Sequence, residues 1–333
     1  MSLIHNPHDK FFKETFGDVG MARSFLKNYL PQEILALVDL ETILPQKDSY
    51  IDQELQESFS DLLFQVKIHK NEGYLYFLFE HKSYPSQGIA LQLLKYMVRI
   101  WESKLKESKP DKLPLIIPMV VYHGQEKWNS SLKLSGIIDN YEQLPNAVTQ
   151  YIPEYEYILY DLSTYTDQEM VGNMLLLIIL RTMRDIFIKD TEAFHNILHE
   201  LLISFERVED QEKGMQFFET LIRYILSTRQ DLELERIYEI AKEVSLERGE
   251  VMMTIAEKLI MEGMEKGLKK GREEGLKKGR EEGLEKGREE GLEKGREETK
   301  LEVARNLLGL GIEMDKVAKA TGLSEEEIRK LMN

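Results

Sequence analysis

Apolar residues recur at helical spacing in two parts of the N-terminal half of the chain. The stretch "DKFFKETFGDVGMARSFLKNYLP", residues 9–31, has this spacing and ends at a proline, which closes a helix. The stretch "GIALQLLKYMVRIWESKLKE", residues 88–107, has it again. Both stretches are predicted to be helical.

The segments between and after these helices have the composition of strands. The runs "LFQVKI", residues 63–68, and "LYFLF", residues 75–79, are separated by "HKNEG", in which Asn71 and Gly73 are turn formers. This pattern predicts a hairpin whose paired residue numbers sum to about 141 to 143. A buried strand follows in "LPLIIPMVVYHG", interrupted by Pro118 and stopped by Gly124, and a short one in "YEYILYDL".

The order helix, strands, helix, strand predicts an α/β or α+β domain, with a mixed sheet flanked by helices, over residues 1–165. Residues 166–262 have helical periodicity without proline and are expected to form several packed helices.

Residues 263–298 are a tandem repeat of eight residues, "GLKKGREE" or "GLEKGREE", with glycine at every fourth position from Gly263 to Gly295. Residues four apart in sequence are rotated by ~40° relative to one another around a helix, and residues eight apart by ~80°. Neither the glycines nor the leucines therefore stay on one face, and the repeat is not a heptad coiled coil. Each glycine costs ~1 kcal/mol relative to alanine. We therefore expect a marginal, frayed or partner-dependent helix that acts as a spacer.

The last segment, residues 299–333, has the spacing of a helix-turn-helix, with Gly311 after its first helix and a third helix capped by Ser324 with Glu327 at its third position. That third helix begins "SEEEIRKL", and its glutamates would repel phosphates. The pattern favours a self-association module, and hence a homo-oligomer through the C-terminal region, over a DNA reader.

Composition narrows the class of protein. The chain has 333 residues, a net charge of −15 and no cysteine, which excludes disulfides, thiolate zinc sites and a general polyanion binder. It has no signal-peptide pattern at its start, and its most apolar run, "NMLLLIILRTM", is shorter than the ~20 residues that a bilayer needs. We expect a cytoplasmic protein without a membrane partner.

The candidate catalytic residues lie on and next to the predicted hairpin. Side chains alternate along strands, so an odd register places Asp61 on the same face as Glu80 and Lys82. Asp61 and Glu80 are expected to bind a hard cation such as Mg²⁺ through oxygen, together with the main-chain carbonyl of His81. Lys82 would then orient or deprotonate a water attacking a phosphoryl group. A Glu and a Lys at a solvated strand end are the plain alternative.

This arrangement resembles the core of PD-(D/E)xK nucleases of restriction-endonuclease-like fold, with Gln92 and Tyr96 similar to the QxxxY element of some members. The motifs "HDKFFKETFGD", "FLFEHKSYP" and "PLIIPMVVYHGQEKW" look like those of the YhgA-like putative transposases, also called recombination-promoting nucleases. The resemblance implies a DNA endonuclease that uses Mg²⁺, Mn²⁺ or Ca²⁺, promotes recombination and binds substrate through Gln92 and Tyr96. Ser60 stands where the superfamily name has proline.

Other interpretations stay open at this stage. The chain could be a noncatalytic DNA-binding or self-assembling protein on a nuclease scaffold, with a role in phage defence, and RNA is a second possible substrate. A packed Tyr96 and a surface Gln92 explain that pair as well as substrate contact does. Glu14 is either a further metal ligand or a solvated residue, and His123 is either structural or in contact with the scissile phosphate.

Overall fold

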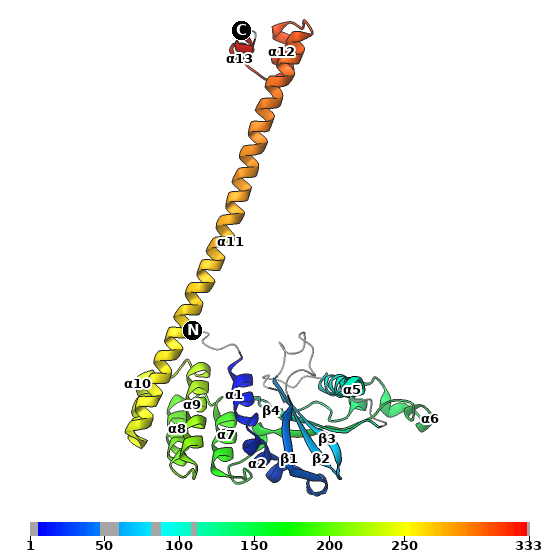
Figure 1. Ribbon diagram of the computed structural model, residues 1–333, viewed down its shortest axis with the longest axis vertical. Helices are drawn as coiled ribbons and strands as arrows, with labels where there is room; N and C mark the ends of the chain where they lie inside the picture. The colour runs from blue at the N-terminus through cyan, green and yellow to red at the C-terminus, as the bar shows by residue number, and fades with distance from the viewer. Residues whose placement is uncertain (1–5, 47–59, 81–87, 108–111, 332–333) are drawn as a thin grey trace. The chain divides into compact units, whose positions relative to one another are not determined.

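The structure is a computed structural model that describes residues 6–46, 60–80, 88–107 and 112–331, without the side chains of residues 60, 61 and 78–80. The chain divides into two compact units, Met1–Met261 and Glu262–Asn333. The first unit contains the sheet and a large helical layer, and the second contains the repeat and the C-terminal helices (Figure 1).

The first unit is built on a five-stranded mixed sheet in the order β1-β2-β3-β4-β5. Its strands are β1 (Val38–Gln46), β2 (Ser60–Ile68), β3 (Asn71–Glu80), β4 (Leu115–Tyr122) and β5 (Ile158–Asp161). The first three strands pair antiparallel, and β3, β4 and β5 pair parallel. The predicted mixed sheet is therefore confirmed. Strand β4 continues through Pro118, which lies one residue before the pairing with β5 begins.

The two faces of the sheet carry different helices, as the alternation of side chains requires. Tyr74 and Tyr76 of β3 pack with residues of helix α5 (Ile89–Glu107), which joins β3 to β4. Leu75 and Phe77, the neighbouring positions, pack instead with the N-terminal helices and the helical layer. The sheet is thus covered on both faces (Figure 1).

The N-terminal helical stretch is two helices rather than one. Helix α1 (Pro7–Phe16) ends at Gly17, and α2 (Val19–Tyr29) begins after Asp18, whose carboxylate accepts a hydrogen bond from the Met21 amide at 2.8 Å. A short helix α3 (Gln32–Leu35) and then β1 follow. The aspartate cap breaks the periodic run because it stabilises a new helix start.

Helices α7 (Met174–Asp185), α8 (Thr191–Phe205), α9 (Gln211–Thr228) and α10 (Leu234–Val244) form the helical layer. They share one apolar core with α1, α2 and one sheet face, and Met252, Ile255 and Leu259 from the start of α11 join it. Residues 166–261 therefore pack as a second layer of the same unit. The connection from β4 to α7 contains short helical turns at η2 (Leu134–Ile137), η3 (Tyr141–Gln143), α6 (Asn146–Thr149) and η4 (Leu162–Thr164).

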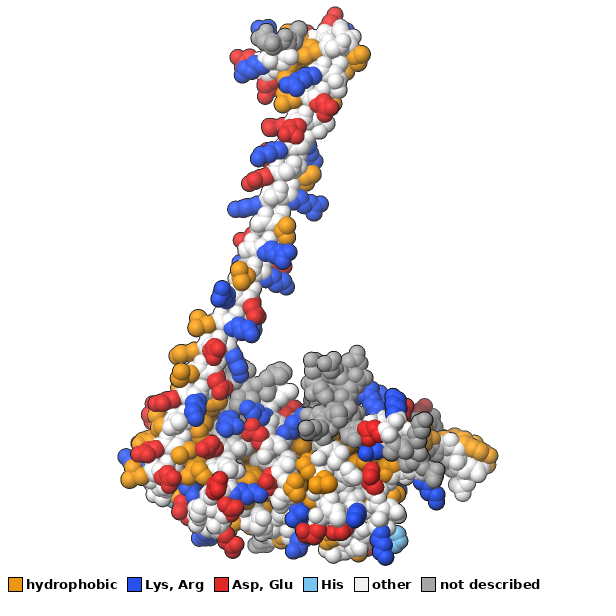
Figure 2. All heavy atoms as spheres, viewed as in Figure 1, with side chains coloured by type: hydrophobic (Ala, Val, Ile, Leu, Met, Phe, Trp, Pro, Cys, Tyr) orange, Lys and Arg blue, Asp and Glu red, His pale blue; other side chains and the backbone are white. Residues whose placement is uncertain are grey.

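Helix α11 (Leu246–Gly309) is 64 residues long and includes the whole repeat. The repeat leucines Leu268, Leu276, Leu284 and Leu292 are 77%, 66%, 66% and 56% exposed. Along this helix, apolar and charged side chains of both signs alternate without a continuous stripe (Figure 2). The repeat is helical, and its expected marginal stability stays a prediction.

The C-terminal helices match the predicted spacing. The end of α11, α12 (Met314–Thr321) and α13 (Glu325–Leu331) enclose a small core around Ala304, Val317 and Ile328. Gly311 and Gly322, with φ of 79° and 72°, make the two turns. Ser324 caps α13: its Oγ accepts from the Glu327 amide at 3.3 Å, and the Glu327 carboxylate accepts from the Ser324 amide at 2.8 Å. Among the helices of the described residues, none is long and apolar enough to cross a membrane.

Candidate active site

The β2–β3 hairpin turns earlier than predicted. Its turn is the pair His69 and Lys70, both with positive φ of 47° and 69°, whereas Asn71 already belongs to β3. Because a two-residue turn of this kind matches the twist of the strands, Ile68 pairs directly with Asn71. Consequently Asp61 pairs with Leu78, two positions short of Glu80, and the predicted sum of 141 to 143 was wrong.

The odd register itself is as predicted. Leu63 on β2 and Tyr76 on β3 form a pair, and both belong to the apolar cluster on the α5 side of the sheet. Because side chains alternate along a strand, position 61 of β2 belongs to the same face as Leu63. Position 80 of β3 belongs to the same face as Tyr76. The side chains of Asp61 and Glu80 are outside the described part of the structure, as are His81 and Lys82 entirely, so the catalytic and metal-binding roles stay predictions.

Positions 61 and 80 lie where the ends of three neighbouring strands meet. The start of β2 lies beside the end of β3, and Glu80 pairs with Tyr122, the last residue of β4. Tyr122 is fully buried, and its ring packs at 5.0 Å against Trp128. A residue that follows β4, such as His123, therefore lies one position beyond the level of Glu80.

Helix α5 holds the predicted substrate-binding pair, Gln92 and Tyr96. Tyr96 is 2% exposed and its ring lies 5.2 Å from that of Tyr76, so it packs α5 onto the sheet. Gln92 is half-buried, and its Nε2 has no hydrogen-bond partner within the described part of the chain. The Gln92 Nε2 atom is itself buried, so the structure shows an unpaired donor inside the described part of the chain and not an exposed binding group. Direct contact of either residue with nucleic acid stays a prediction.

Glu14 and His123 both have structural partners. The Glu14 carboxylate lies 3.2 Å from the Arg223 guanidinium of α9 and 3.8 Å from Lys10. His123 is 1% exposed, and its Nε2 lies 2.5 Å from the carbonyl oxygen of Met183. The structure thus supports the structural interpretation for both side chains.

A buried aromatic cluster around His123 was not predicted. The rings of His8 and Phe187 lie 5.1 Å and 4.7 Å from that of His123, and His8 Nδ1 lies 2.7 Å from the Tyr224 hydroxyl. Burial raises the pKa of Tyr224 well above its ordinary value, so its hydroxyl stays protonated. The cluster ties α1, α7 and α9 to the end of β4. The "NPH" start of α1 gives no sign of this role, because the partners are more than a hundred residues away.

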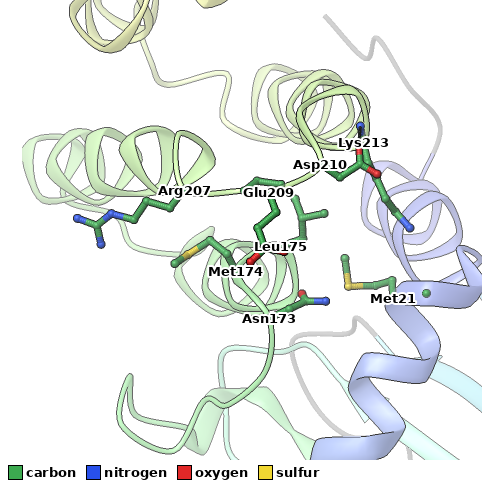
Figure 3. Close-up of a pocket in the computed structure, with 10 residues that line it drawn as sticks. Met21, Asn173, Met174, Leu175, Arg207, Glu209, Asp210 and Lys213 are labelled. Atoms are coloured by element: carbon green, nitrogen blue, oxygen red, sulfur yellow. Dashed lines mark hydrogen bonds between the residues drawn. The ribbon is translucent and has the colours of Figure 1, made fainter.

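A cavity of about 400 Å³ lies elsewhere, where three helices begin (Figure 3). Asp18, Asn173 and Asp210 cap α2, α7 and α9, each by accepting a backbone hydrogen bond. Lys213 Nζ is bound to Asp18 Oδ1 at 2.8 Å, and Arg207 and Glu209 complete a lining of mixed charge. With its helix ends already capped, this cavity offers no catalytic set, and no predicted site residue lines it.

Comparison with known proteins gives the family. The profile of the family described as "Putative transposase, YhgA-like" matches residues 6–213, which include the sheet, α5 and the start of α9. The chain belongs to the YhgA-like transposase family. A second profile, described as the C-terminal helix-turn-helix domain of the Rpn/YhgA-like nuclease family, matches residues 297–333. The predicted family and the predicted helix-turn-helix are both confirmed. The match does not support the expectation that this module serves self-association and not DNA reading.

Relatives of this YhgA-like chain include proteins named nucleases and a protein named inactive. It is 28% identical to the recombination-promoting nuclease RpnA of Escherichia coli (strain K12) over 97% of this chain and 96% of the relative. It is 27% identical to the nuclease RpnD of Escherichia coli O157:H7, over 76% and 94%. It is also 27% identical to the inactive recombination-promoting nuclease-like protein RpnE of strain K12, over 79% and 84%. No solved structure matches this chain.

Among the described residues there is no group of three His, Cys, Asp or Glu side chains that could hold a metal ion. The predicted ligands lie outside the residues searched, so metal binding by them stays a prediction. The paired positions 61 and 78 place position 80 on the diagonal, at which Cβ atoms of neighbouring strands are ~7 Å apart.

Proposed function

We propose that this chain is a metal-dependent endonuclease that hydrolyses phosphodiester bonds of DNA and promotes recombination. The observation that carries the proposal is the register of the β2–β3 hairpin. Asp61 pairs with Leu78, two positions from Glu80, so positions 61 and 80 belong to the same face of the sheet. The relatives named recombination-promoting nucleases, of which one covers almost the whole chain, support the same activity. A relative of similar identity is named inactive.

Asp61, Glu80 and the carbonyl of His81 would hold Mg²⁺, or Mn²⁺ or Ca²⁺ in its place, since all three donors are oxygens. The bound ion supplies a polarised phosphoryl oxygen and a more acidic water. Lys82 orients the attacking water and offsets the negative charge that develops on the phosphate oxygens. Asp61 and Glu80 are needed together, because each carboxylate alone is a weak ligand for a hard cation. Lys82 is needed beside them for its role on the attacking water.

Helix α5 positions the substrate in this proposal. Gln92 Nε2 is buried and has no partner among the described residues, and in this proposal the side chain turns outward to donate a hydrogen bond to the nucleic acid backbone. Tyr96 keeps α5 against Tyr76 and so fixes where Gln92 lies. The C-terminal helix-turn-helix binds DNA as a second contact, in keeping with its family description.

The decisive test is cleavage of supercoiled plasmid by the full chain in Mg²⁺, Mn²⁺, Ca²⁺ or EDTA. Asp61→Ala, Glu80→Ala and Lys82→Ala are each expected to lower the rate by at least about 100-fold. Glu41→Ala is the matched control, since Glu41 is an acidic residue of β1 that pairs with Arg23. Cleavage that persists in the three site variants or in EDTA would refute the proposal.

A second candidate function follows from the relative named inactive. If the chain binds DNA without cutting it, the native protein and the three site variants will retain plasmid equally and produce no nicked or linear product in any metal. Such a result assigns the chain to the noncatalytic members and leaves its helix-turn-helix as the DNA-binding part.

A further inference from the structure

Helix α5 carries apolar residues beyond the face that is buried against the sheet. The inner face is buried against the sheet and consists of Ile89, Leu93, Tyr96, Met97 and Ile100. A second set, here called the outer stripe, consists of Leu91, Leu94, Val98, Trp101 and Leu105. Within the outer stripe Leu91, Val98 and Leu105 are 45%, 40% and 45% exposed, while Leu94 and Trp101 are half-buried and pack with one side against the same cluster as the inner face. A helix that only covers a sheet needs one apolar face.

The outer stripe has the spacing of a coiled-coil seam. Its residues follow one another at intervals of three, four, three and four, which is the heptad pattern of positions a and d. Two heptads extend ~21 Å along a helix. Such a seam is complementary to the same seam on another helix, whereas the glycine repeat of α11 lacks heptad spacing.

We propose that the outer stripe of α5 binds the outer stripe of a second copy of this chain, in antiparallel orientation about a two-fold axis. In an antiparallel pair, position a opposes position d of the other helix. Leu94 would therefore meet Leu105 of the second copy, and Val98 would meet Trp101. By symmetry each contact occurs twice, which makes the stripe self-complementary.

Charged residues beside the stripe select this orientation. Lys95 and Glu102 are both exposed. They directly follow Leu94 and Trp101, the two d positions, and so lie at the edge of the seam. In the antiparallel pair Lys95 lies next to Glu102 of the second copy, twice. A parallel pair would instead place them near Ala90 and Met97, without charge complementarity. Opposite charges at seam edges set partner orientation in paired helices.

Trp101 supplies a fixed anchor at the centre of the contact. Its indole N–H donates a hydrogen bond to the Pro114 carbonyl oxygen at 2.9 Å, which fixes the ring before any partner binds. A large aromatic side chain that is already ordered loses little conformational entropy on binding. The stripe therefore combines a preorganised ring with exposed aliphatic neighbours.

The test is the mass of the full chain by sedimentation equilibrium over a range of concentrations. The native chain is expected to be dimeric, and Val98→Glu to weaken association by at least about 100-fold, because each glutamate would bury an unpaired charge against Trp101 of the second copy. Leu276→Glu with Leu284→Glu, on the repeat, is the matched control and should leave the mass unchanged. A native monomer, or a dimer lost only in the repeat variant, would overturn the proposal. Circular dichroism confirms that each variant is folded.

A charge exchange tests the orientation. Lys95→Glu and Glu102→Lys are each expected to weaken the dimer about 10-fold, because each places like charges together twice. The chain carrying both changes restores opposite pairs and should regain native association. Failure of that double variant to recover would rule out the antiparallel contact.

The dimer has a consequence for cleavage that rests on the proposed function. Two copies bring two candidate sites, so the dimer would produce linear plasmid early, and Val98→Glu would produce nicked circles instead. Absence of any cleavage by the native chain would count against the proposed nuclease activity. The sedimentation result would still test the proposed dimer.

Discussion

The two compact units of the chain reach helical structure by different routes. In Met1–Met261, helices are amphipathic and bury one face in a shared core, and Phe12, Phe25 and Leu176 are fully buried. In Glu262–Asn333, the repeat has no buried side chain, and glycine replaces the residues that would pack. Tertiary contact stabilises the first unit, whereas only backbone hydrogen bonds and exposed ion pairs such as Lys270 with Glu274 stabilise the repeat.

This difference indicates which substitutions each unit tolerates. A core position is constrained by its neighbours, so loss of atoms leaves a cavity. A repeat position is constrained only by helix propensity, so substitution by a better helix former is stabilising. The four predictions below test that contrast, from the largest expected effect to the smallest.

Truncation of Phe25 should be the most damaging single change. Its ring is fully buried and contacts Phe16, Tyr29 and Tyr160 at centroid distances of 5.3, 4.8 and 4.9 Å. Phe25→Ala is expected to lower the free energy of unfolding of the first unit by about 4 kcal/mol. Leu284→Ala, at a 66% exposed position, should change it by less than about 0.5 kcal/mol. Urea denaturation gives both values, and comparable losses would remove the contrast.

Replacement of repeat glycines should strengthen the helix without strain. A Cβ added at Gly271, Gly275, Gly279 or Gly283 would meet no atom within 4 Å. Alanine at all four positions is expected to stabilise the local helix by about 3 kcal/mol. Circular dichroism of a peptide of residues 263–298 should show a marked gain in helicity. A native peptide that is already fully helical at low concentration would contradict the expected marginal stability.

Loss of the α13 cap should weaken the small C-terminal core. Ser324→Ala removes the hydroxyl that accepts from the Glu327 amide, at an expected cost of about 1 kcal/mol. Hydrogen exchange of α12 and α13 amides reports this change directly. Ser324→Asp, which keeps a capping oxygen, is the control and should retain native protection.

The smallest effect concerns pH. The Arg229 guanidinium hydrogen-bonds the Asp231 carboxylate at 2.8 Å and lowers the pKa of that carboxyl. A lowered folded pKa stabilises the protein above the ordinary pKa of ~4 and ceases to do so as pH falls through the folded value. Because Asp231 is half exposed, Asp231→Asn should cost at most about 1 kcal/mol at pH 7.

The difference between native and Asp231→Asn chains should shrink as pH falls below ~4, since the native carboxylate is then protonated. Thermal unfolding at pH 7 and pH 3 measures it. A difference that is equal at both values would show that lost packing around Arg229, and not the charge, is responsible.

Periodic segments with one buried face could be predicted from the sequence. Helix α5, strand β4 and the cap at Ser324 lie where their patterns indicated, because in each case one local signal dominates. The hairpin itself was also predicted. Its turn was misplaced because His69 and Lys70 adopt positive φ although neither residue type is favoured there over the neighbouring Asn71.

Strand β1 could not be predicted from its composition. Its sequence "VDLETILPQ" contains two acidic residues and Pro45, all unfavourable in a central strand. An edge strand tolerates them because one side of its backbone has no neighbour, and a register shift between Asp39 and Leu44 relieves the pairing. The aromatic cluster of His8, His123 and Tyr224 was missed for another reason, since only tertiary folding brings those residues together.

The two-residue turn at His69 and Lys70 also limits how this hairpin is able to change in length during evolution. If the strands re-pair around a two-residue turn, inserting one residue there would exchange inside and outside for every position of one strand, Asp61 included. Inserting two would extend the loop and preserve which positions share a face. Length variation at this tip is therefore expected to occur in even steps wherever positions 61 and 80 are both kept acidic.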